Sequence, residues 1–186
     1  TSFEGVIYHD DITLSDFEDA HPDALATYRS WGLPDAIVDI RANDDTLGRW
    51  TVLKINALDQ FASEVSSTVR RYKPSLITAR NLYAQVAINP RAEVWYAQAL
   101  ENSLANYDFT AIMAMPYMEQ ASDPIAFQKR ILSGIGRFPS ARNRIVFELQ
   151  TVDWRYNQKP IPVDEIVATV GMLYDAGVSH IAYYPD

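Results

Sequence analysis

The stretch Thr110-Ala111-Ile112-Met113-Ala114-Met115, followed by Pro116-Tyr117-Met118-Glu119, shows the pattern that best indicates the fold of this chain. The run is almost continuously apolar, is too short for a helix and ends at a proline, which is typical of a strand buried on both faces. Runs of the same kind occur at Gly5 to Tyr8, Leu76 to Ala79, Arg144 to Leu149 and His180 to Tyr184. We therefore predict five strands.

Segments with helical spacing lie between these runs. The third and fourth of them begin at Asp123-Pro124 and Ile161-Pro162, because a first helical turn tolerates proline, and Gly177 is expected to end the last helix. The apolar residues expected on the helix faces are Leu47, Trp50, Leu53, Leu58, Phe61, Val65 and Val69; Val94, Ala97, Leu100 and Leu104; Phe127, Ile131 and Ile135; and Ile166, Val170 and Leu173. Continuously apolar strands that alternate with helices predict an α/β fold with a parallel sheet covered by helices.

Polar and aromatic residues follow every predicted strand. The exits are Tyr8-His9-Asp10-Asp11, Arg80-Asn81-Leu82-Tyr83, Pro116-Tyr117-Met118-Glu119, Gln150-Thr151-Val152-Asp153-Trp154 and Tyr183-Tyr184-Pro185-Asp186. In a (β/α)8 barrel the carboxyl ends of all strands meet at one mouth, so these side chains would share one cleft. A doubly wound open sheet is the alternative, but no glycine-rich phosphate turn follows any strand.

A complete (β/α)8 barrel takes about 250 residues, and this chain has 186. We therefore expect residues 1–186 to form a single domain that holds roughly the last five βα units of a TIM-type barrel, with the first barrel strands absent. The beginning of the chain supports this expectation, since Thr1-Ser2 leads directly into a buried-strand pattern.

Composition excludes several classes of protein. An apolar fraction of 48% supports a folded core rather than a disordered chain. A net charge of −8 without a run of Lys or Arg argues against a nucleic-acid surface and suits a neutral or cationic partner. The absence of cysteine removes disulfides, Cys-type zinc sites and thiol nucleophiles.

Carboxylates at the strand exits are the first candidates for chemistry. Asp10 and Asp11 stand within a residue or two of a strand end, where site residues of parallel α/β folds concentrate, although a solvated acidic loop is the competing interpretation. Glu119 follows an apolar run that contains Met and Tyr, which would raise its pKa and suit a general acid, or it is a helix-entry acid. Two carboxyl groups that face one cleft are what glycoside hydrolysis requires.

Aromatic residues at the same mouth suit a sugar ligand, because a pyranose presents an apolar face and a rim of hydroxyl groups. The candidates are Tyr117, Trp154, Tyr183 and Tyr184, whereas Trp31, Trp50 and Trp95 are expected in the core. Arg80 and Asn81 are candidates for binding hydroxyl or carboxylate groups, and a structural salt bridge is the alternative for Arg80.

A metal site and a serine triad find little support in the same residues. His9-Asp10-Asp11 could begin a ligand set, but the other histidines are His21 and His180, and the chain has no His-x-x-x-His. It also has no Gly-x-Ser-x-Gly elbow. We expect no metal and no cofactor, and a nucleophile that is a carboxylate or a water oxygen.

Taken in order, these motifs resemble the C-terminal domain of the poly-β-1,6-N-acetyl-D-glucosamine deacetylase family of Gram-negative bacteria. The resemblance covers nearly the whole chain. The matching segments are Tyr8-His9-Asp10-Asp11, Leu14-Ser15-Asp16-Phe17-Glu18-Asp19-Ala20, Thr78-Ala79-Arg80-Asn81, Tyr107 to Tyr117, Glu148-Leu149-Gln150 with Trp154, and Tyr183-Tyr184-Pro185-Asp186.

The resemblance implies a (β/α)8 domain that binds and cleaves a partly deacetylated polymer as an endo-acting glycoside hydrolase. It implies an N-terminal, metal-dependent deacetylase domain that is absent here, an outer-membrane-associated protein of the periplasm, and a role in export of a biofilm exopolysaccharide, with an outer-membrane export pore as a further partner. It also implies acidic catalytic or binding roles for Asp10, Asp11 and Asp16, with Glu119 opposite. The residues that would bind sugar are His9, Arg80, Asn81, Tyr117, Trp154, Tyr183 and Tyr184.

Charge bears independently on specificity. Deacetylated glucosamine units are cationic near neutral pH, and an acidic cleft in a chain of net charge −8 would favour them over acetylated units. The alternative function is a non-catalytic polysaccharide-binding module that holds or guides the polymer for a partner deacetylase domain.

Overall fold

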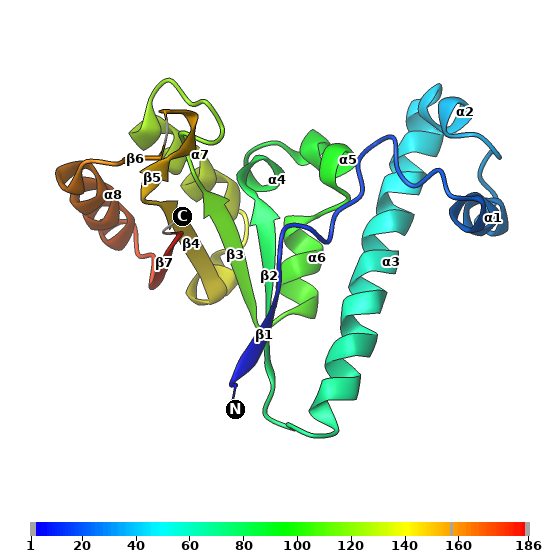
Figure 1. Ribbon diagram of the computed structural model, residues 1–186, viewed down its shortest axis with the longest axis horizontal. Helices are drawn as coiled ribbons and strands as arrows, with labels where there is room; N and C mark the ends of the chain where they lie inside the picture. The colour runs from blue at the N-terminus through cyan, green and yellow to red at the C-terminus, as the bar shows by residue number, and fades with distance from the viewer. Residues whose placement is uncertain (1–2, 157, 185–186) are drawn as a thin grey trace.

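The strands form one curled, parallel sheet in the order in which they occur along the chain (Figure 1). The computed structural model describes residues 3–156 and 158–184, and within these residues the main sheet has five strands. The prediction of part of a (β/α)8 barrel is confirmed, because each strand pairs in parallel with the next one of the sheet. The strands are β1 (Gly5–Tyr8), β2 (Ile77–Tyr83), β3 (Phe109–Ala114), β4 (Ile145–Gln150) and β7 (His180–Tyr184).

The register of the strands separates two faces of the sheet. Leu82 is level with Ile112, which is level with Phe147, and all three belong to the main apolar core. Side chains alternate between faces along a strand, so the next level, which includes Tyr83 and Glu148, belongs to the other face. One face of the sheet therefore packs on helices, and the other carries Tyr83 and Glu148.

The four predicted helical regions are helical, and local residues explain where they begin. The Asn43 side chain accepts hydrogen bonds from the backbone N–H groups of Asp45 and Thr46, and Asp123 accepts one from Ala126 at 2.9 Å. Gly177 has a φ of +82°, which glycine adopts without strain after the last helix. The helices are α3 (Asp44–Arg70), α5 (Glu93–Tyr96), α6 (Leu100–Asn106), α7 (Pro124–Ile135) and α8 (Val163–Asp175).

The core lies between the sheet and helices α6, α7 and α8. Phe127 and Ile131 of α7 and Leu173 of α8 join the strand residues in one buried cluster. Gly134 lets α7 approach α4 (Ala84–Ile88) closely, because a Cβ atom there would lie 2.0 Å from the Ala87 carbonyl oxygen.

The structure corrects the predicted limits of β2. The strand continues through Arg80 and Asn81 to Tyr83, although these residues were predicted as a strand exit. Arg80 donates to backbone carbonyls and the Asn81 amide nitrogen donates to Glu148, so the strand does not have to end before them.

The helix predicted through Val94 and Leu104 is wrong, since α5 and α6 are separate helices. Ala97 between them has a φ of 45°, a left-handed conformation that ends α5.

The predictions for three apolar residues are also wrong, including Val65 of α3, which is 37% exposed. Trp95 is 47% exposed, while Trp50 is fully buried as expected and Trp31 is partly buried against it. Phe61 of α3 is 56% exposed, because Ala62 and Ser66 face the sheet through Tyr8.

A helical extension stands beside the sheet, and its two short helices were not predicted. It consists of α1 (Pro22–Ser30), α2 (Ile37–Arg41) and the first half of α3, and it lies at the right of Figure 1. The extension has a small core of its own, formed by Tyr28, Leu33, Ile40 and Trp50.

The remaining elements are short. β5 (Val152–Asp153) and β6 (Lys159–Pro160) pair in an antiparallel manner, and short 3-10 helices occur at Pro90–Ala92, Pro139–Arg144 and Trp154–Tyr156. In the described part of the chain, none of the helices has the length and apolar character needed to cross a membrane.

Candidate active site at the carboxyl ends of the strands

Buried contacts of Tyr8 and Arg80 fix the position of the loop after β1. Tyr8, the last residue of β1, is buried, and its hydroxyl lies 2.8 Å from the Ala62 carbonyl oxygen and 2.6 Å from Ser66 Oγ on α3. The buried guanidinium of Arg80 donates to the carbonyl oxygens of Tyr8 at 3.2 Å, of His9 at 2.6 Å, and of Ile12. Arg80 therefore supports the loop that carries His9 and Asp10, and its donors are used within the fold.

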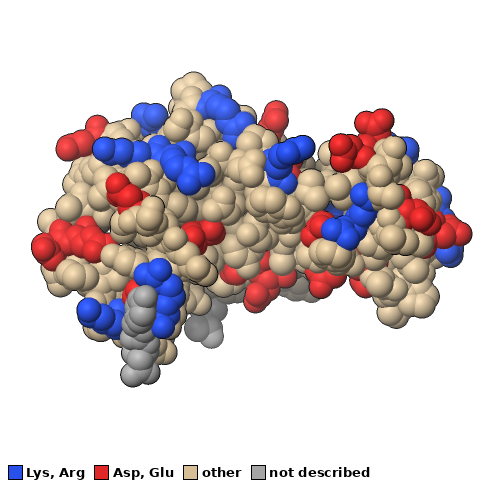
Figure 2. Space-filling model, turned by 90° about the horizontal axis from the view of Figure 1, so that it is seen from above, with Lys and Arg blue, Asp and Glu red and all other residues tan. Residues whose placement is uncertain are grey.

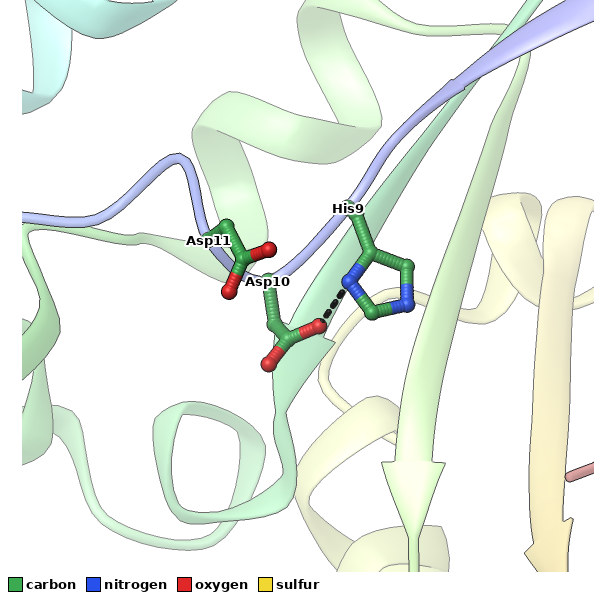
Figure 3. A group of neighbouring side chains, drawn as sticks. All are labelled: His9, Asp10 and Asp11. Atoms are coloured by element: carbon green, nitrogen blue, oxygen red, sulfur yellow. Dashed lines mark ion pairs between the residues drawn. The ribbon is translucent and has the colours of Figure 1, made fainter. Parts of the chain in front are cut away.

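Asp10 is nearly buried at the end of β1, with 9% of its surface exposed. Its Oδ2 accepts a hydrogen bond from the Tyr83 hydroxyl at 3.1 Å, and its Oδ1 faces Nδ1 of His9 (Figure 3). Asp11, the next residue in the loop, is exposed. The site therefore contains one enclosed carboxylate and one solvated carboxylate in sequence.

Glu148 is a second carboxyl group of the site, beside Asp10, and it is half-buried. Asn81 Nδ2 donates to Glu148 Oε2 at 2.9 Å, and Asn81 is fully buried. Burial raises the pKa of Glu148, the Asn81 hydrogen bond and His9 lower it, and the charge of Asp10 raises it further. Asp10, His9 and Glu148 thus form one electrostatically coupled group.

Glu148 was not predicted as a site residue, although it belongs to a segment that carries the resemblance. The available signal was a single acidic residue inside the apolar run Arg144 to Leu149. Such a residue is costly to bury unless it is bonded, so it marks a polar face of its strand.

Two stacked tyrosines connect Asp10 to the region of Glu119. The ring of Tyr83 stacks on Tyr96 with centroids 4.3 Å apart and an interplanar angle of 19°. Burial, together with Asp10, raises the pKa of Tyr83 to about 12, so its hydroxyl stays protonated and donates to Asp10. Glu119 accepts from Gln85 Nε2 at 2.7 Å, and its charge adds to burial in raising the pKa of Tyr96.

Three aromatic rings form a further part of the site. The His9 and Tyr184 ring centroids are 6.3 Å apart, and Trp154 meets Tyr184 edge-on at 6.0 Å. These three rings come from the ends of β1 and β7 and from the turn after β5. They form a row beside the two carboxyl groups.

Three predicted residues lie elsewhere. Asp16 pairs with Arg41 of α2 at 2.9 Å, within the helical extension. The Tyr117 hydroxyl donates to Glu165 of α8 at 2.6 Å. Tyr183 is 70% exposed and points to the face of β7 opposite Tyr184. Pro185 and Asp186 of the predicted last exit lie outside the described residues.

One group of side chains in the site has donor atoms close enough together to bind a metal ion. His9, Asp10 and Asp11 each offer one donor atom, and these atoms lie within 4.8 Å of one another. Exposed acidic groups of this kind are common without an ion, and nothing else at these residues points to one, so we assign no metal to them.

The chemistry available here is that of two enclosed carboxyl groups beside aromatic rings. Such pairs protonate a leaving oxygen and stabilise a developing positive charge, as in glycoside hydrolysis.

Comparison with known proteins agrees with this assignment. Residues 1–184 match the sequence model of a family described as "Hypothetical glycosyl hydrolase family 13". The chain is 35% identical over 190 residues to the poly-beta-1,6-N-acetyl-D-glucosamine N-deacetylases of Escherichia coli strain K12 and of Escherichia coli O157:H7. It matches with all of its length, and it spans 28% of the length of these relatives.

A solved structure is similar along almost the whole chain. It is the PgaB (BpsB) glycoside hydrolase domain from Bordetella bronchiseptica, with 40% sequence identity and a TM-score of 0.93. The alignment covers 99% of this chain and 52% of that structure.

Proposed function

This chain belongs to the family described as hypothetical glycosyl hydrolase family 13, and on that premise we propose that it cleaves partly deacetylated poly-β-1,6-N-acetyl-D-glucosamine at internal linkages. The chain is of glycoside hydrolase type. The endo-acting cleavage and the polymer are our proposal.

The observation that carries the proposal is the position of Asp10. This carboxylate is 9% exposed, lies at the carboxyl end of β1, and receives a hydrogen bond from a tyrosine hydroxyl rather than an ion pair from Arg or Lys. A carboxylate whose ion-pair partner is a histidine rather than a permanently charged Arg or Lys can stabilise the positive charge that develops on a sugar ring during hydrolysis.

The polymer is proposed from the names of the relatives and from charge. Relatives from Escherichia coli are named as deacetylases of this polymer. Figure 2 looks onto the end at which the strands terminate and shows acidic side chains near the middle of this face, with many Lys and Arg side chains along its upper margin. An acidic centre would attract glucosamine ammonium groups, so we expect binding to weaken as salt is added. Affinity that does not change with salt would contradict this part of the proposal.

Other residues of the site are proposed to bind sugar. Tyr184 and Trp154 offer aromatic faces, and His9, Asp11 and Glu119 offer polar groups. Asn81, which is fully buried and donates to Glu148, is proposed to position that carboxyl group. Arg80, through its three carbonyl contacts, is proposed to act by positioning the loop after β1.

The wider setting is also a proposal. A relative's deacetylase name suggests that the polymer reaches this domain after partial deacetylation, from a deacetylase domain of the same protein, in the periplasm at the outer membrane and beside an export pore. Fractionation of cells that produce the longest protein carrying these residues would test the location, and recovery in the cytoplasm would contradict it.

The test of the function compares binding with cleavage. Partly deacetylated polymer is incubated with the longest protein that carries these residues, and new reducing ends and bound polymer are measured in parallel. New reducing ends that accumulate from the interior of the polymer are expected. Tight binding without new reducing ends would instead identify a module that holds the polymer.

A further inference from the structure

Glu148 occupies the face of the sheet on which the candidate site lies. Glu148 of β4 is level with Met113 of β3, and Met113 is level with Tyr83 of β2. Glu148 and Tyr83 therefore lie on either side of β3. Neighbouring strands are about 4.8 Å apart, and the two side chains reach inward from both sides: Tyr83 contacts Asp10, and Glu148 contacts Asn81 of the same strand as Tyr83.

Asn81 makes the two oxygens of Glu148 different. Its amide nitrogen donates to Oε2 at 2.9 Å, and among residues 3–156 and 158–184 no hydrogen bond reaches Oε1. When the carboxyl group is protonated, Oε2 can remain the acceptor while Oε1 carries the proton. Since Glu148 is half-buried rather than sealed, this proton can reach a ligand in the site.

Burial favours the protonated form of Glu148, against the Asn81 hydrogen bond and His9, which both lower its pKa. The titratable groups that act on it are His9 and Asp10, both from the loop after β1. Desolvation is the largest influence and raises the pKa, and the negative charge of Asp10 acts in the same direction. A pair of carboxyl groups in unequal environments separates into one proton donor and one ionised carboxylate.

We propose that Glu148 is the general acid of this site and that Asp10 is the ionised carboxylate that works with it. This assignment rests on the proposed glycoside hydrolysis. Glu148 gives its proton to the bridging oxygen, which keeps the electron pair of the broken bond to the anomeric carbon. Asp10 stabilises the positive charge at that carbon, water adds its oxygen there, and the proton lost by this water restores the Glu148 carboxyl group.

The geometry separates Glu119 from this pair. Glu119 acts on the pKa of Tyr96, whereas Asp10 acts on that of Tyr83, so the two carboxyl groups lie toward different rings of the Tyr83 and Tyr96 stack. Glu119 therefore fits a binding role on the Tyr96 side of the stacked pair.

The experiment compares two substrates with different leaving groups. One is the partly deacetylated polymer, and the other is a 2,4-dinitrophenyl β-glycoside of a partly deacetylated oligosaccharide, whose leaving group departs without a proton. For Glu148→Gln, we expect kcat/KM on the polymer to fall by about 10²- to 10⁴-fold, and kcat/KM on the dinitrophenyl glycoside to stay within about threefold. Glu101→Gln, on the exposed surface of α6, is the matched control and should change neither value.

Each other outcome overturns the assignment. Equal loss on both substrates would mean that Glu148 is structural, and no loss on either would mean that it has no role in proton donation. A parent protein that cleaves neither substrate would refute the proposed function itself, which distinguishes the two failures.

A second measurement uses only the parent protein, so it holds even if the variant folds poorly. The kcat/KM of the polymer should fall at high pH as Glu148 loses its proton, and the dinitrophenyl glycoside should lack this decline. Both substrates carry the same amino groups, so titration of the amines affects both. An identical decline with both substrates would contradict the assignment.

Discussion

The loop that leaves β1 carries Asp10 into the strand-end site and Asp16 into the helical extension, and the two carboxylates have different partners. Asp10 receives a tyrosine hydroxyl and faces an imidazole, whereas Asp16 pairs with the Arg41 guanidinium at 2.9 Å. The charge of Asp16 is compensated by a fixed cation. Among the described residues Asp10 has no Arg or Lys partner, and the His9 ring that faces it is charged only if protonated, so the carboxylate can interact with a substrate.

The helical extension also contains a buried cation with fixed partners. Lys54 is 1% exposed, and its ammonium donates to the carbonyl oxygens of Ser15 and Glu18 and lies 3.7 Å from the centre of the Trp50 ring. Polar groups in the extension are thus used to fasten the loop. In the strand-end site, Asp10 and Glu148 lie near His9, and within the described residues neither forms an ion pair with Arg or Lys.

Replacing Asp10 should give the largest effect. Asp10→Asn keeps the size of the side chain but removes its charge, so we expect hydrolysis of the polymer to fall by about 10³-fold, the middle of the range for such groups. Binding of the polymer should persist. The measurement is the initial rate of reducing-end formation, and a rate within tenfold of the parent would remove Asp10 from the mechanism.

Lys54 should give a pH-dependent effect on stability. Burial lowers its pKa from 10.5 to about 8. Between these values the unfolded chain binds more protons than the folded one, so the contribution of Lys54 to the free energy of unfolding rises with pH.

This rise amounts to on the order of 3 kcal/mol, at ~1.4 kcal/mol for each pKa unit. Urea unfolding of the parent and of Lys54→Met, measured from pH 7 to above pH 10, gives the difference directly. A difference that does not change with pH would show that the lysine is not desolvated.

Tyr83→Phe should have an intermediate effect. It removes the hydrogen bond to Asp10 and keeps the stack on Tyr96, and a hydrogen bond to a charged group contributes ~1.5–3 kcal/mol. We expect kcat to fall by about 10- to 100-fold, with Tyr72→Phe, at an 88% exposed tyrosine, as the matched control. Unchanged kcat would show that the hydroxyl does not assist Asp10.

Asp16→Asn should give the smallest effect. The Asp16 and Arg41 side chains are 21% and 34% exposed, and partly exposed ion pairs contribute less than about 1 kcal/mol. The midpoint of unfolding should move slightly, and the rate on the polymer should remain near that of the parent. A loss comparable to that of Asp10→Asn would restore Asp16 to the catalytic role predicted from sequence.

The strands could be predicted because a short apolar run between two helical segments is typical of a buried strand and of little else. β1 and β7 have the limits predicted from their apolar runs, and α7 begins after Asp123 as predicted. Helices α1 and α2 of the extension were missed because they are short and become stable only against Trp50, which is distant in sequence.

The site was predicted less completely, because its contacts also join residues that are distant in sequence. Sequence places Asp10 and Asp16 in one acidic loop, and only folding brings Tyr83 to the first and Arg41 to the second. Glu148 lies inside an apolar run, and its face became evident only from the register with Met113 and the hydrogen bond from Asn81.

The most direct test of Asp10 as the catalytic carboxylate is the size of the polymer after incubation with the parent, Asp10→Asn and Asp16→Asn proteins, determined by mass spectrometry of the products. We predict short oligosaccharides from the parent and from Asp16→Asn, and intact polymer bound to Asp10→Asn. Short products from Asp10→Asn, or intact polymer with a folded parent that binds it, would contradict this assignment.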